Sequence, residues 1–443
     1  MSKSIVSVVR YEKPFESVRK AVELAGGLGQ LPAGAKVFLK PNIVTWTRAT
    51  PFPKWGVITT ARVVEDVVAL LKEQGVNDIT IGEGMVLNDP KDRETPADAF
   101  ESLYGALGRR YGVRCLNVFE RPFERVDLGD GVKLAFSSDF LASDFVINLP
   151  ALKTHAALVV SLGIKNLKGV LDVSSRKKCH SSKPGRDLHF LVSKLPNALP
   201  PTFTLLDGIY TLERGPGVDG KARRTNVLVA SADILSADMV GARVLGHDPA
   251  AVPHLVLCAK DRGRPADLSD VEVIGEPIEN VASFHEYDFP FDHEASLPVP
   301  FVKAGFKGIA YRKFDLTLCT YCFNVNATAL TAIARAWQGK PWNEIEVLTG
   351  KSMTPTPGKK KTILIGRCMH KANKDHPDIQ EAIAVKGCPP SPKEVAEAFH
   401  KAGIDVDPAL FENMDRLPGA YLKRYEGKPE FDEAFYRPLP DQS

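Results

Sequence analysis

Four of the seven cysteines lie between Cys319 and Cys388, and their spacing predicts a metal-binding site. Cys319 and Cys322 form a C-x-x-C pair, Cys368 follows an expected strand, and Cys388 precedes an expected helix. A C-x-x-C turn presents two thiolates to one metal ion or to one edge of a cluster. A thiolate near a helix N-terminus is stabilised by free backbone amides, which lower its pKa.

A [4Fe–4S] cluster is the cofactor that this cysteine pattern favours. Structural zinc sites usually combine two close C-x-x-C pairs, whereas Cys368 and Cys388 are far apart in the sequence. The Cys-Pro dipeptide at Cys388 also favours iron–sulfur ligation. Zinc, or thiols that are unligated or redox-active, are the alternatives. We expect Cys115 and Cys258 to be core thiols and Cys179 to be a bystander.

A second concentration of reactive side chains lies in residues 151–183, where Asp172 is the only acid. A local cationic field of this kind attracts anions. A solvated basic surface helix is the alternative interpretation. The basic residues and histidines of this stretch are Lys153, His155, Lys165, Lys168, Arg176, Lys177, Lys178, His180 and Lys183.

Polar residues also follow the expected strands at the points where these strands end. Each one alone could be a loop residue or a helix cap, but the carboxyl ends of parallel strands meet at one edge of a sheet. We therefore expect one polar rim. The residues at these strand ends are Lys40, Asn42, Glu83, Lys153, His155 and Asp207.

The rim suits an anionic small molecule, a carboxylate or a phosphate, with His155 or Glu83 transferring a proton. Nearby lysines should lower the pKa of His155 and keep it available as a base. The carboxylates could instead hold a divalent ion with a phosphate. The predicted catalytic residues are Lys153, His155, Glu83 and Lys165. The predicted substrate-binding residues are Lys40, Asn42, Asn166, Lys168, His180 and Asp207.

The alternation of expected strands and helices predicts an α/β protein with a large, three-layer domain built on a mostly parallel sheet. A small C-terminal α/β domain would carry the cysteines. The expected boundaries are 1–275 for the large domain, 276–312 for a connecting segment, 313–410 for the iron–sulfur domain and 411–443 for a tail. One expected helix of the small domain spans 324–337.

Composition limits the remaining choices. The chain of 443 residues is 44% hydrophobic and 25% charged with a net charge of +3, which is typical of a globular protein and too mild to indicate nucleic-acid binding. No apolar run is long enough for a transmembrane helix, and the first residues lack a secretory leader. We expect a reducing, cytoplasmic location without disulfides.

Taken in order, these motifs resemble a protein family, domain of unknown function 362, over residues 37–257. The resemblance implies iron–sulfur association, although many members carry an eight-cysteine ferredoxin-type module that this chain replaces with four dispersed cysteines. A single cluster is therefore expected. The matching residues are Lys40, Pro41, Asn42, Glu83, Asn148, Leu149, Pro150, Leu152, Lys153, Thr154, His155, Lys165, Asn166, Gly169, His180, Asp207, Gly208, Gly215, Pro216, Gly217, Asp233 and Asp238.

These observations favour an iron–sulfur-dependent enzyme, an oxidoreductase or a lyase, that acts on an anionic small molecule. A non-enzymatic electron carrier or maturation protein is one alternative, and a zinc-stapled anion-binding protein is another. The expected partners are the anionic substrate, with a redox protein and a second copy of the chain left open. Neither nucleic acid nor a membrane is expected.

Overall fold

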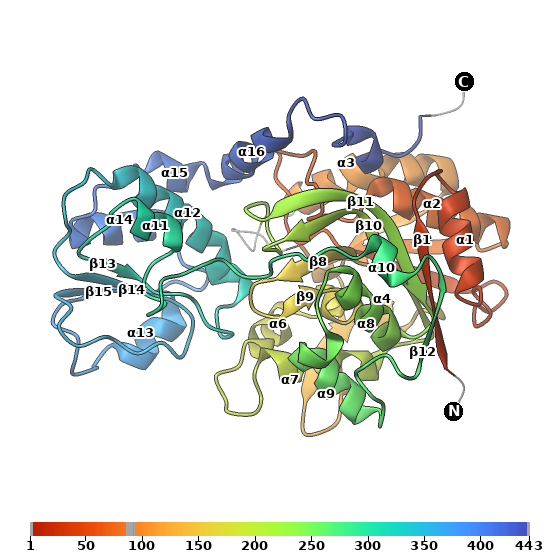
Figure 1. Cartoon of the computed structure of the whole chain (residues 1–443), viewed down its shortest axis with the longest axis horizontal. Coiled ribbons are helices and arrows are strands. Elements are labelled where there is room, and N and C mark those ends of the chain that lie inside the picture. Colours follow the sequence, from red (N-terminus) through yellow and green to blue (C-terminus); the bar gives the residue numbers. More distant parts are fainter. Residues whose placement is uncertain (1–2, 86–91, 93, 441–443) are drawn as a thin grey trace.

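The computed structural model describes residues 3–85, 92 and 94–440, and these form two lobes, each built around one β-sheet (Figure 1). We call the part from β1 (Ser4–Arg10) to β12 (Val271–Gly275) the large lobe. The part from β13 (Ile309–Tyr311) to α14 (Pro392–Ala402) is the small lobe. Short helices α10 (Ile278–Val281) and α11 (Val299–Lys303) lie between them in the sequence.

The main path of the large sheet runs in the order β12-β1-β11-β10-β7-β2-β3-β4. Of these strands only β11 runs antiparallel to its neighbours, so the sheet is mostly parallel and the predicted α/β class is confirmed. The remaining strands of this path are β2 (Lys36–Pro41), β3 (Asp78–Glu83), β4 (Arg114–Asn117), β7 (Phe145–Leu149), β10 (Thr202–Glu213) and β11 (Lys221–Ser231).

Helices cover both faces of the large sheet and give it three layers (Figure 1). Alternating side chains of the strands enter two separate cores, as expected for a sheet buried on both faces. One face is covered by α1 (Glu16–Leu24), α2 (Ala61–Glu73) and α3 (Glu94–Tyr111). The other is covered by α4 (Ser138–Leu141), α7 (Leu188–Ser193), α8 (Ile234–Val244) and α9 (Pro253–Asp261).

After β7 the chain makes an excursion from the main path of the sheet, and this excursion contributes residues to the site. It continues as β8 (Ala151–His155) and β9 (Val159–Ser161), then as the short helices α5 (Gly163–Asn166) and η2 (Leu167–Val170). Helix α6 (Val173–Cys179) follows, begun by Asp172, whose carboxylate accepts from the backbone N–H of Ser175 at 2.7 Å. A separate hairpin, β5 (Phe123–Asp127) with β6 (Lys133–Ser137), packs beside this excursion.

The small lobe contains four parallel strands in the order β13-β14-β15-β16, with β14 at Ile345–Leu348, β15 at Lys361–Ile365 and β16 at Ala382–Val385. Helices α12 (Thr320–Ala336) and α14 share its main core, and α13 (Arg367–Asn373) packs on the other face. Helix α12 begins four residues before the predicted Asn324. The C-x-x-C pair therefore lies at a helix N-terminus rather than in a preceding loop.

The C-terminal segment returns from the small lobe and crosses the large one (blue in Figure 1). Tyr425 and Tyr436 enter the core of the large lobe, and Tyr436 is fully buried among Phe52, Trp55 and Tyr210. The hydroxyl of Tyr436 donates to the backbone carbonyl of Lys54 at 2.7 Å and accepts from the N–H of Gly56 at 3.0 Å.

Replacing Tyr436 by alanine should lower the free energy of unfolding by about 3–5 kcal/mol, because it empties a packed aromatic site. Urea unfolding measures the loss. The matched control is Leu439→Ala, whose side chain is 39% exposed and should change stability by less than about 0.5 kcal/mol. Equal effects of the two variants would show that this segment does not contribute to the core.

Candidate functional site

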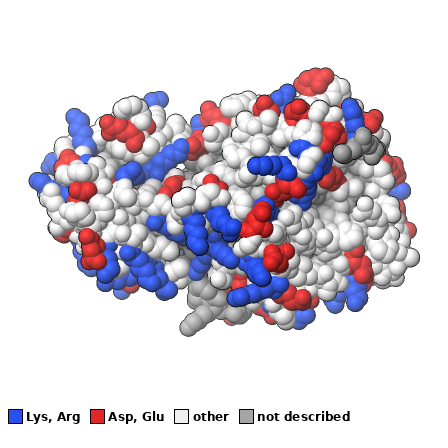
Figure 2. Space-filling view, turned by 90° about the horizontal axis from the view of Figure 1, so that it is seen from below, with Lys and Arg blue, Asp and Glu red and all other residues white. Residues whose placement is uncertain are grey.

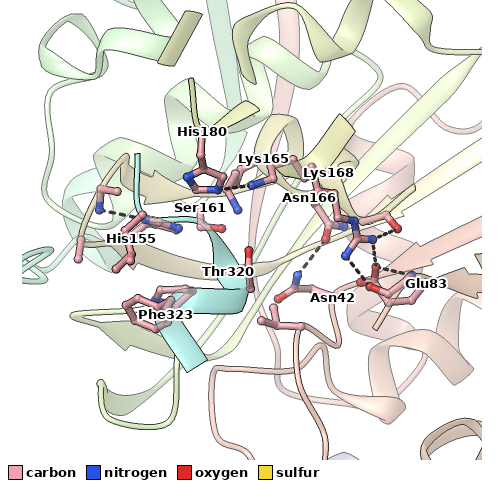
Figure 3. A pocket seen from close by; sticks show the side chains of 18 of the residues that line it. Asn42, Glu83, His155, Ser161, Lys165, Asn166, Lys168, His180, Thr320 and Phe323 are labelled. Atoms are coloured by element: carbon pink, nitrogen blue, oxygen red, sulfur yellow. Dashed lines mark hydrogen bonds and ion pairs between the residues drawn. The ribbon is translucent and has the colours of Figure 1, made fainter. Parts of the chain in front are cut away.

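A cavity of about 100 Å³ lies between the carboxyl ends of β2 and β3 and the beginning of α12 (Figure 3). Most of its lining residues come from the large lobe, and Phe314, Leu318, Thr320 and Phe323 come from the small lobe. Ligands of open α/β sheets bind outside the carboxyl ends of the strands, and this cavity has that position.

The floor of the cavity contains a buried ion pair between Lys40 at the end of β2 and Glu83 at the end of β3, with 2.7 Å between Nζ and Oε2. Burial lowers the pKa of Lys40, and the Glu83 carboxylate opposes this effect. The carboxylate also accepts from the N–H groups of Ile43 at 3.2 Å and Gly84 at 2.9 Å. Glu83 lines the cavity, but Lys40 is fully buried beneath it.

A chain of amide side chains joins this ion pair to the neighbouring strands. Lys153 donates to Oδ1 of Asn42 at 2.5 Å, and Nδ2 of Asn42 donates to Oδ1 of Asn166 at 3.0 Å. The Nδ2 group of Asn166 donates to Asn148 at 2.8 Å, and Asn148 donates to the carbonyl of Gly163 at 3.1 Å. These bonds fix the loop that carries the cavity lysines. Asn42 and Asn166 line the cavity, whereas Lys153 lies behind them.

Two further contacts position the segment 163–170. The Asp238 carboxylate on α8 accepts from the N–H groups of Gly163 at 2.6 Å and Ile164 at 2.8 Å, and so holds the first turn of α5. At the other end, Gly169 lies against the ion pair. A Cβ atom added there would come within 2.3 Å of Glu83 and 2.4 Å of Lys40, so this close approach requires glycine.

Lys165, on the segment 163–170, lines the cavity but has no hydrogen-bonding or ion-pair partner among the described residues. Burial, together with the charges of Lys168 and Lys153, holds the pKa of Lys165 well below its usual range. An anion in the cavity would therefore supply the missing counter-charge.

Lys168 and His180 form a hydrogen-bonded pair on the same wall, with 2.7 Å between Nζ and Nε2. The Nδ1 atom of His180 lies 3.0 Å from the carbonyl oxygen of Leu316 and can only donate to it. The Nε2 atom then accepts from Lys168, which requires a neutral imidazole. In agreement, burial and Lys168 hold the pKa of His180 well below its usual range, and burial lowers that of Lys168 to about 8.

His155 also lines the cavity, and its pKa is lowered first by burial and then by Lys165 and Lys168, in the predicted direction. Its Nδ1 atom accepts from the N–H of Ala157 at 3.0 Å. In the neutral ring the proton is therefore on Nε2. In this state His155 offers a donor to a ligand, whereas the prediction assigned it the role of a base.

The structure separates the predicted rim into lining and supporting residues. His155, Lys165, Lys168, His180, Asn42, Asn166 and Glu83 line the cavity, and Lys40, Lys153 and Asp207 do not. The Asp207 carboxylate accepts from the N–H groups of Thr60 at 2.7 Å and Ile209 at 3.1 Å, near the start of α2. Asp207 lies at the same edge of the sheet as the lining residues, but its carboxylate is occupied by these two backbone hydrogen bonds.

The lining residues that were not predicted as site residues include Ser161, Arg176, Thr320 and Phe323. Arg176 was counted in the basic stretch, and its guanidinium donates to the carbonyls of Gly84 at 2.8 Å and Gly169 at 2.5 Å. Thr320 lies inside the C-x-x-C pair. Nothing in the local sequence indicates that these two regions meet.

The four cysteines gather at the carboxyl edge of the small sheet. Cys319 precedes α12 and Cys322 lies in its first turn, while Cys368 and Cys388 follow β15 and β16. Hydrogen bonding between the two thiols of the C-x-x-C pair lowers the pKa of Cys319 and raises that of Cys322, and the charges of Cys388 and Cys368 raise the latter further. Cys319, Cys368 and Cys388 therefore all lie within electrostatic reach of Cys322.

This donor set consists of four thiols, each of which could supply a thiolate ligand. Its surroundings are polar and cationic, since Lys177 of α6 donates to Sγ of Cys388 at 3.2 Å. Gly366 lies against Cys322, where an added Cβ would be 3.1 Å from the sulfur atom. No three His, Cys, Asp or Glu side chains in the described parts of the chain are close enough to hold one metal ion together. A [4Fe–4S] cluster uses one thiolate for each of four irons.

The other three cysteines have different surroundings. Cys179 and Cys258 are buried, and burial raises the pKa of both thiols. The expectation of a core thiol at Cys115 is wrong: this residue is exposed on β4, which is the edge strand of the large sheet.

The two lobes contact each other at the basic stretch. The Nζ atom of Lys351 donates to the backbone carbonyl oxygens of Lys177, at 2.9 Å, and of His180. The Lys177 ammonium lies 4.6 Å from the ring centre of Tyr321, inside the C-x-x-C pair. Figure 2 shows Lys and Arg side chains concentrated on one face where the lobes join.

The fold and the cavity define an α/β protein with a cationic pocket closed by a cysteine-bearing lobe. Residues 37–243, which lie in the large lobe, match the model of the family described as Domain of unknown function (DUF362). The predicted resemblance to this family is therefore confirmed over these residues.

Two known proteins are similar to parts of the chain. The Thylakoid-associated protein sll1697 from Synechocystis sp. (strain ATCC 27184 / PCC 6803 / Kazusa) is 29% identical over 256 residues, which cover 56% of this chain and 74% of that protein. The lactate racemase apoprotein from Thermoanaerobacterium thermosaccharolyticum matches with a TM-score of 0.37 at 15% identity, over 55% of this chain and 57% of that one. No helix in the described part of the chain has the length and apolarity needed to span a membrane.

Lys153 provides a pH test of the supporting network. Burial lowers its pKa to about 7, from about 10.4 in an unfolded chain. Between these values the unfolded state binds a proton that the folded state lacks, so the free energy of unfolding rises with pH. In Lys153→Met this contribution is absent. The stability of wild type relative to the variant should increase between pH 7 and 10, by up to about 1.4 kcal/mol per pH unit.

Urea unfolding at several pH values measures this difference. The exposed residue Lys178, which donates to the carbonyl of Lys133, provides the control. Lys178→Met should follow the wild-type pH dependence. A wild-type stability that runs parallel to that of Lys153→Met would contradict a neutral, buried Lys153.

Proposed function

We propose that the protein binds an anionic small molecule, a carboxylate or a phosphate, in the cavity between its lobes and acts on it as an iron–sulfur enzyme. The observation that supports this most directly is Lys165, a cation that lines the cavity and has no partner among the described residues. A buried charge without a partner is unfavourable, and a bound anion removes that cost.

The remaining charges support the sign of the ligand. Lys168 and Arg176 line the same cavity, and its carboxylate, Glu83, is already compensated by Lys40 at 2.7 Å. His155 contributes an N–H donor in its neutral form. An anion therefore gains Lys165, Lys168 and an imidazole N–H, while Arg176, whose N–H groups bind backbone carbonyls, adds positive charge to the wall. Among the described lining residues, no uncompensated carboxylate faces the anion.

We assign proton transfer to His155 rather than to Glu83. Glu83 accepts from Lys40, Ile43 and Gly84, and these bonds leave its carboxylate engaged. His155 in its neutral form can donate the Nε2 proton to a ligand atom. A bound anion would raise its pKa and make this exchange accessible near neutral pH.

We assign Cys319, Cys322, Cys368 and Cys388 to a [4Fe–4S] cluster. Such a cluster supplies electron transfer, or Lewis acidity where one iron is open. Thr320 connects the two sites, because it lies between Cys319 and Cys322 and also lines the cavity. The exposed position of Cys368 fits a reducing compartment such as the cytoplasm, with a redox protein able to reach the cluster.

Replacing Lys165 by methionine should weaken the binding of inorganic phosphate by about 10- to 100-fold, the effect of losing one charge-assisted hydrogen bond. Isothermal titration calorimetry of the full-length protein measures the dissociation constant. The variant should unfold at the same urea concentration as wild type or higher, because it loses a half-buried lysine that has no partner among the described residues. Lys178→Met serves as a control with unchanged affinity. Equal phosphate binding by Lys165→Met and wild type would contradict the proposed site.

Anaerobically purified wild-type protein should contain about four irons per chain and absorb broadly in the visible range. Cys388→Ser should lose most of this absorption and iron, because one thiolate ligand is missing. Cys115→Ser, altered at an exposed cysteine outside the set, should keep both. A colourless protein that contains one zinc would exclude the cluster. Full iron content in Cys388→Ser would remove Cys388 from the ligands.

A further inference from the structure

A larger groove of about 420 Å³ adjoins the cationic cavity. Four residues line both spaces and form the wall between them: Val44, Pro216, Thr320 and Phe323. The cavity itself is small, at about 100 Å³ against about 420 Å³ for the groove. A ligand much larger than its anionic group must therefore extend beyond the cavity, and the groove is the space beside it.

The groove differs from the cavity in chemistry. Apolar and aromatic side chains line much of it, from the loop after β2 (Trp46), the β10–β11 turn (Val218), α12 (Ala327) and the C-terminal segment (Leu417 and Tyr421). Surfaces of this composition bind hydrocarbon through the hydrophobic effect.

The charges in the groove are opposite to those in the cavity. Asp219 and Asp415 line it, and its Arg48 is bound to Asp98 in an ion pair. An anionic group would be repelled here, whereas Lys165 and Lys168 attract it in the cavity. The two spaces together therefore orient a ligand that is charged at one end only.

The shared wall is strained at Val44. Its φ angle of 58° lies in the left-handed region, which is rare for a β-branched residue. Strain of this kind persists only where the surroundings enforce it, and it concentrates at ligand sites. Phe323, which also lines both spaces, lies 4.0 Å from the position that a Cβ of Gly217 would occupy. The wall thus consists of two apolar side chains, one proline and one threonine.

We propose that the substrate is an amphiphilic anion, with its carboxylate or phosphate in the cavity and an apolar chain lying in the groove. This inference rests on the proposed function and specifies its substrate class. The chain crosses from cavity to groove at the shared wall, between Val44 and Phe323.

The test measures how affinity depends on chain length. Methyl, butyl and hexyl phosphate are titrated into the full-length, anaerobically purified protein by calorimetry, with inorganic phosphate as the reference. Each buried methylene group strengthens binding by about three- to fourfold when fully buried. We expect hexyl phosphate to bind at least about tenfold more tightly than methyl phosphate.

Two variants place the effect in the groove. Leu417→Asp and Ala327→Asp add a charge to residues that line the groove but not the cavity. Both side chains are partly exposed, so the fold should tolerate the substitutions. The test requires only one of the two variants to be folded. They should bind methyl phosphate like wild type and lose the preference for hexyl phosphate. Val302→Asp, at a 46% exposed position on α11, is the matched control and should keep the preference.

The outcomes separate this inference from the proposed function. Binding of all phosphates with the same affinity would overturn the amphiphilic substrate and leave the anion site in place. Absence of binding by every phosphate would overturn both. A chain-length preference that persists in the folded Leu417→Asp and Ala327→Asp variants would place the apolar chain outside the groove and overturn the inference.

Discussion

The buried ion pair between Lys40 and Glu83 is the interaction on which the site depends. It joins the ends of two neighbouring parallel strands, and Gly169 lies directly on it. Removing one partner of such a pair leaves an uncompensated charge in the interior and typically costs about 3–5 kcal/mol. The same pair neutralises the one carboxylate of the cavity wall. The pair thus has both a structural and an electrostatic role, because Lys40 offsets the charge of Glu83 at the cavity wall.

From this pair, a continuous set of hydrogen bonds leads outward to the ligand-facing groups. Asn42, Asn166 and Asn148 connect β2, β7 and α5, and Asp238 holds the backbone where α5 begins. Because each buried amide has partners, the network can be rigid at low cost. Lys165 and Lys168 project from this fixed segment. The arrangement places flexible, charged side chains on a backbone that does not need to rearrange when an anion binds.

The small lobe completes the cavity. Its residues Leu318, Thr320 and Phe323 close one side, and Lys177 of the large lobe reaches the sulfur atom of Cys388. The groove that we assign to an apolar chain is also shared, because the C-terminal segment returns to line it. Substrate binding and the orientation of the lobes are therefore expected to depend on each other.

The sequence by itself determined the α/β class, the resemblance to a family and the residue types at the strand ends, because these follow from local periodicity and from short motifs. It also identified seven of the polar and charged lining residues, since parallel strands deliver their ends to one edge. Only the tertiary structure decided which polar residues face the cavity and which are buried supports, as for Lys40, Lys153 and Asp207. It also decided that Thr320 and Phe323 meet the basic stretch. Such contacts join residues far apart in the chain, and they depend on how the two lobes pack, which no local pattern encodes.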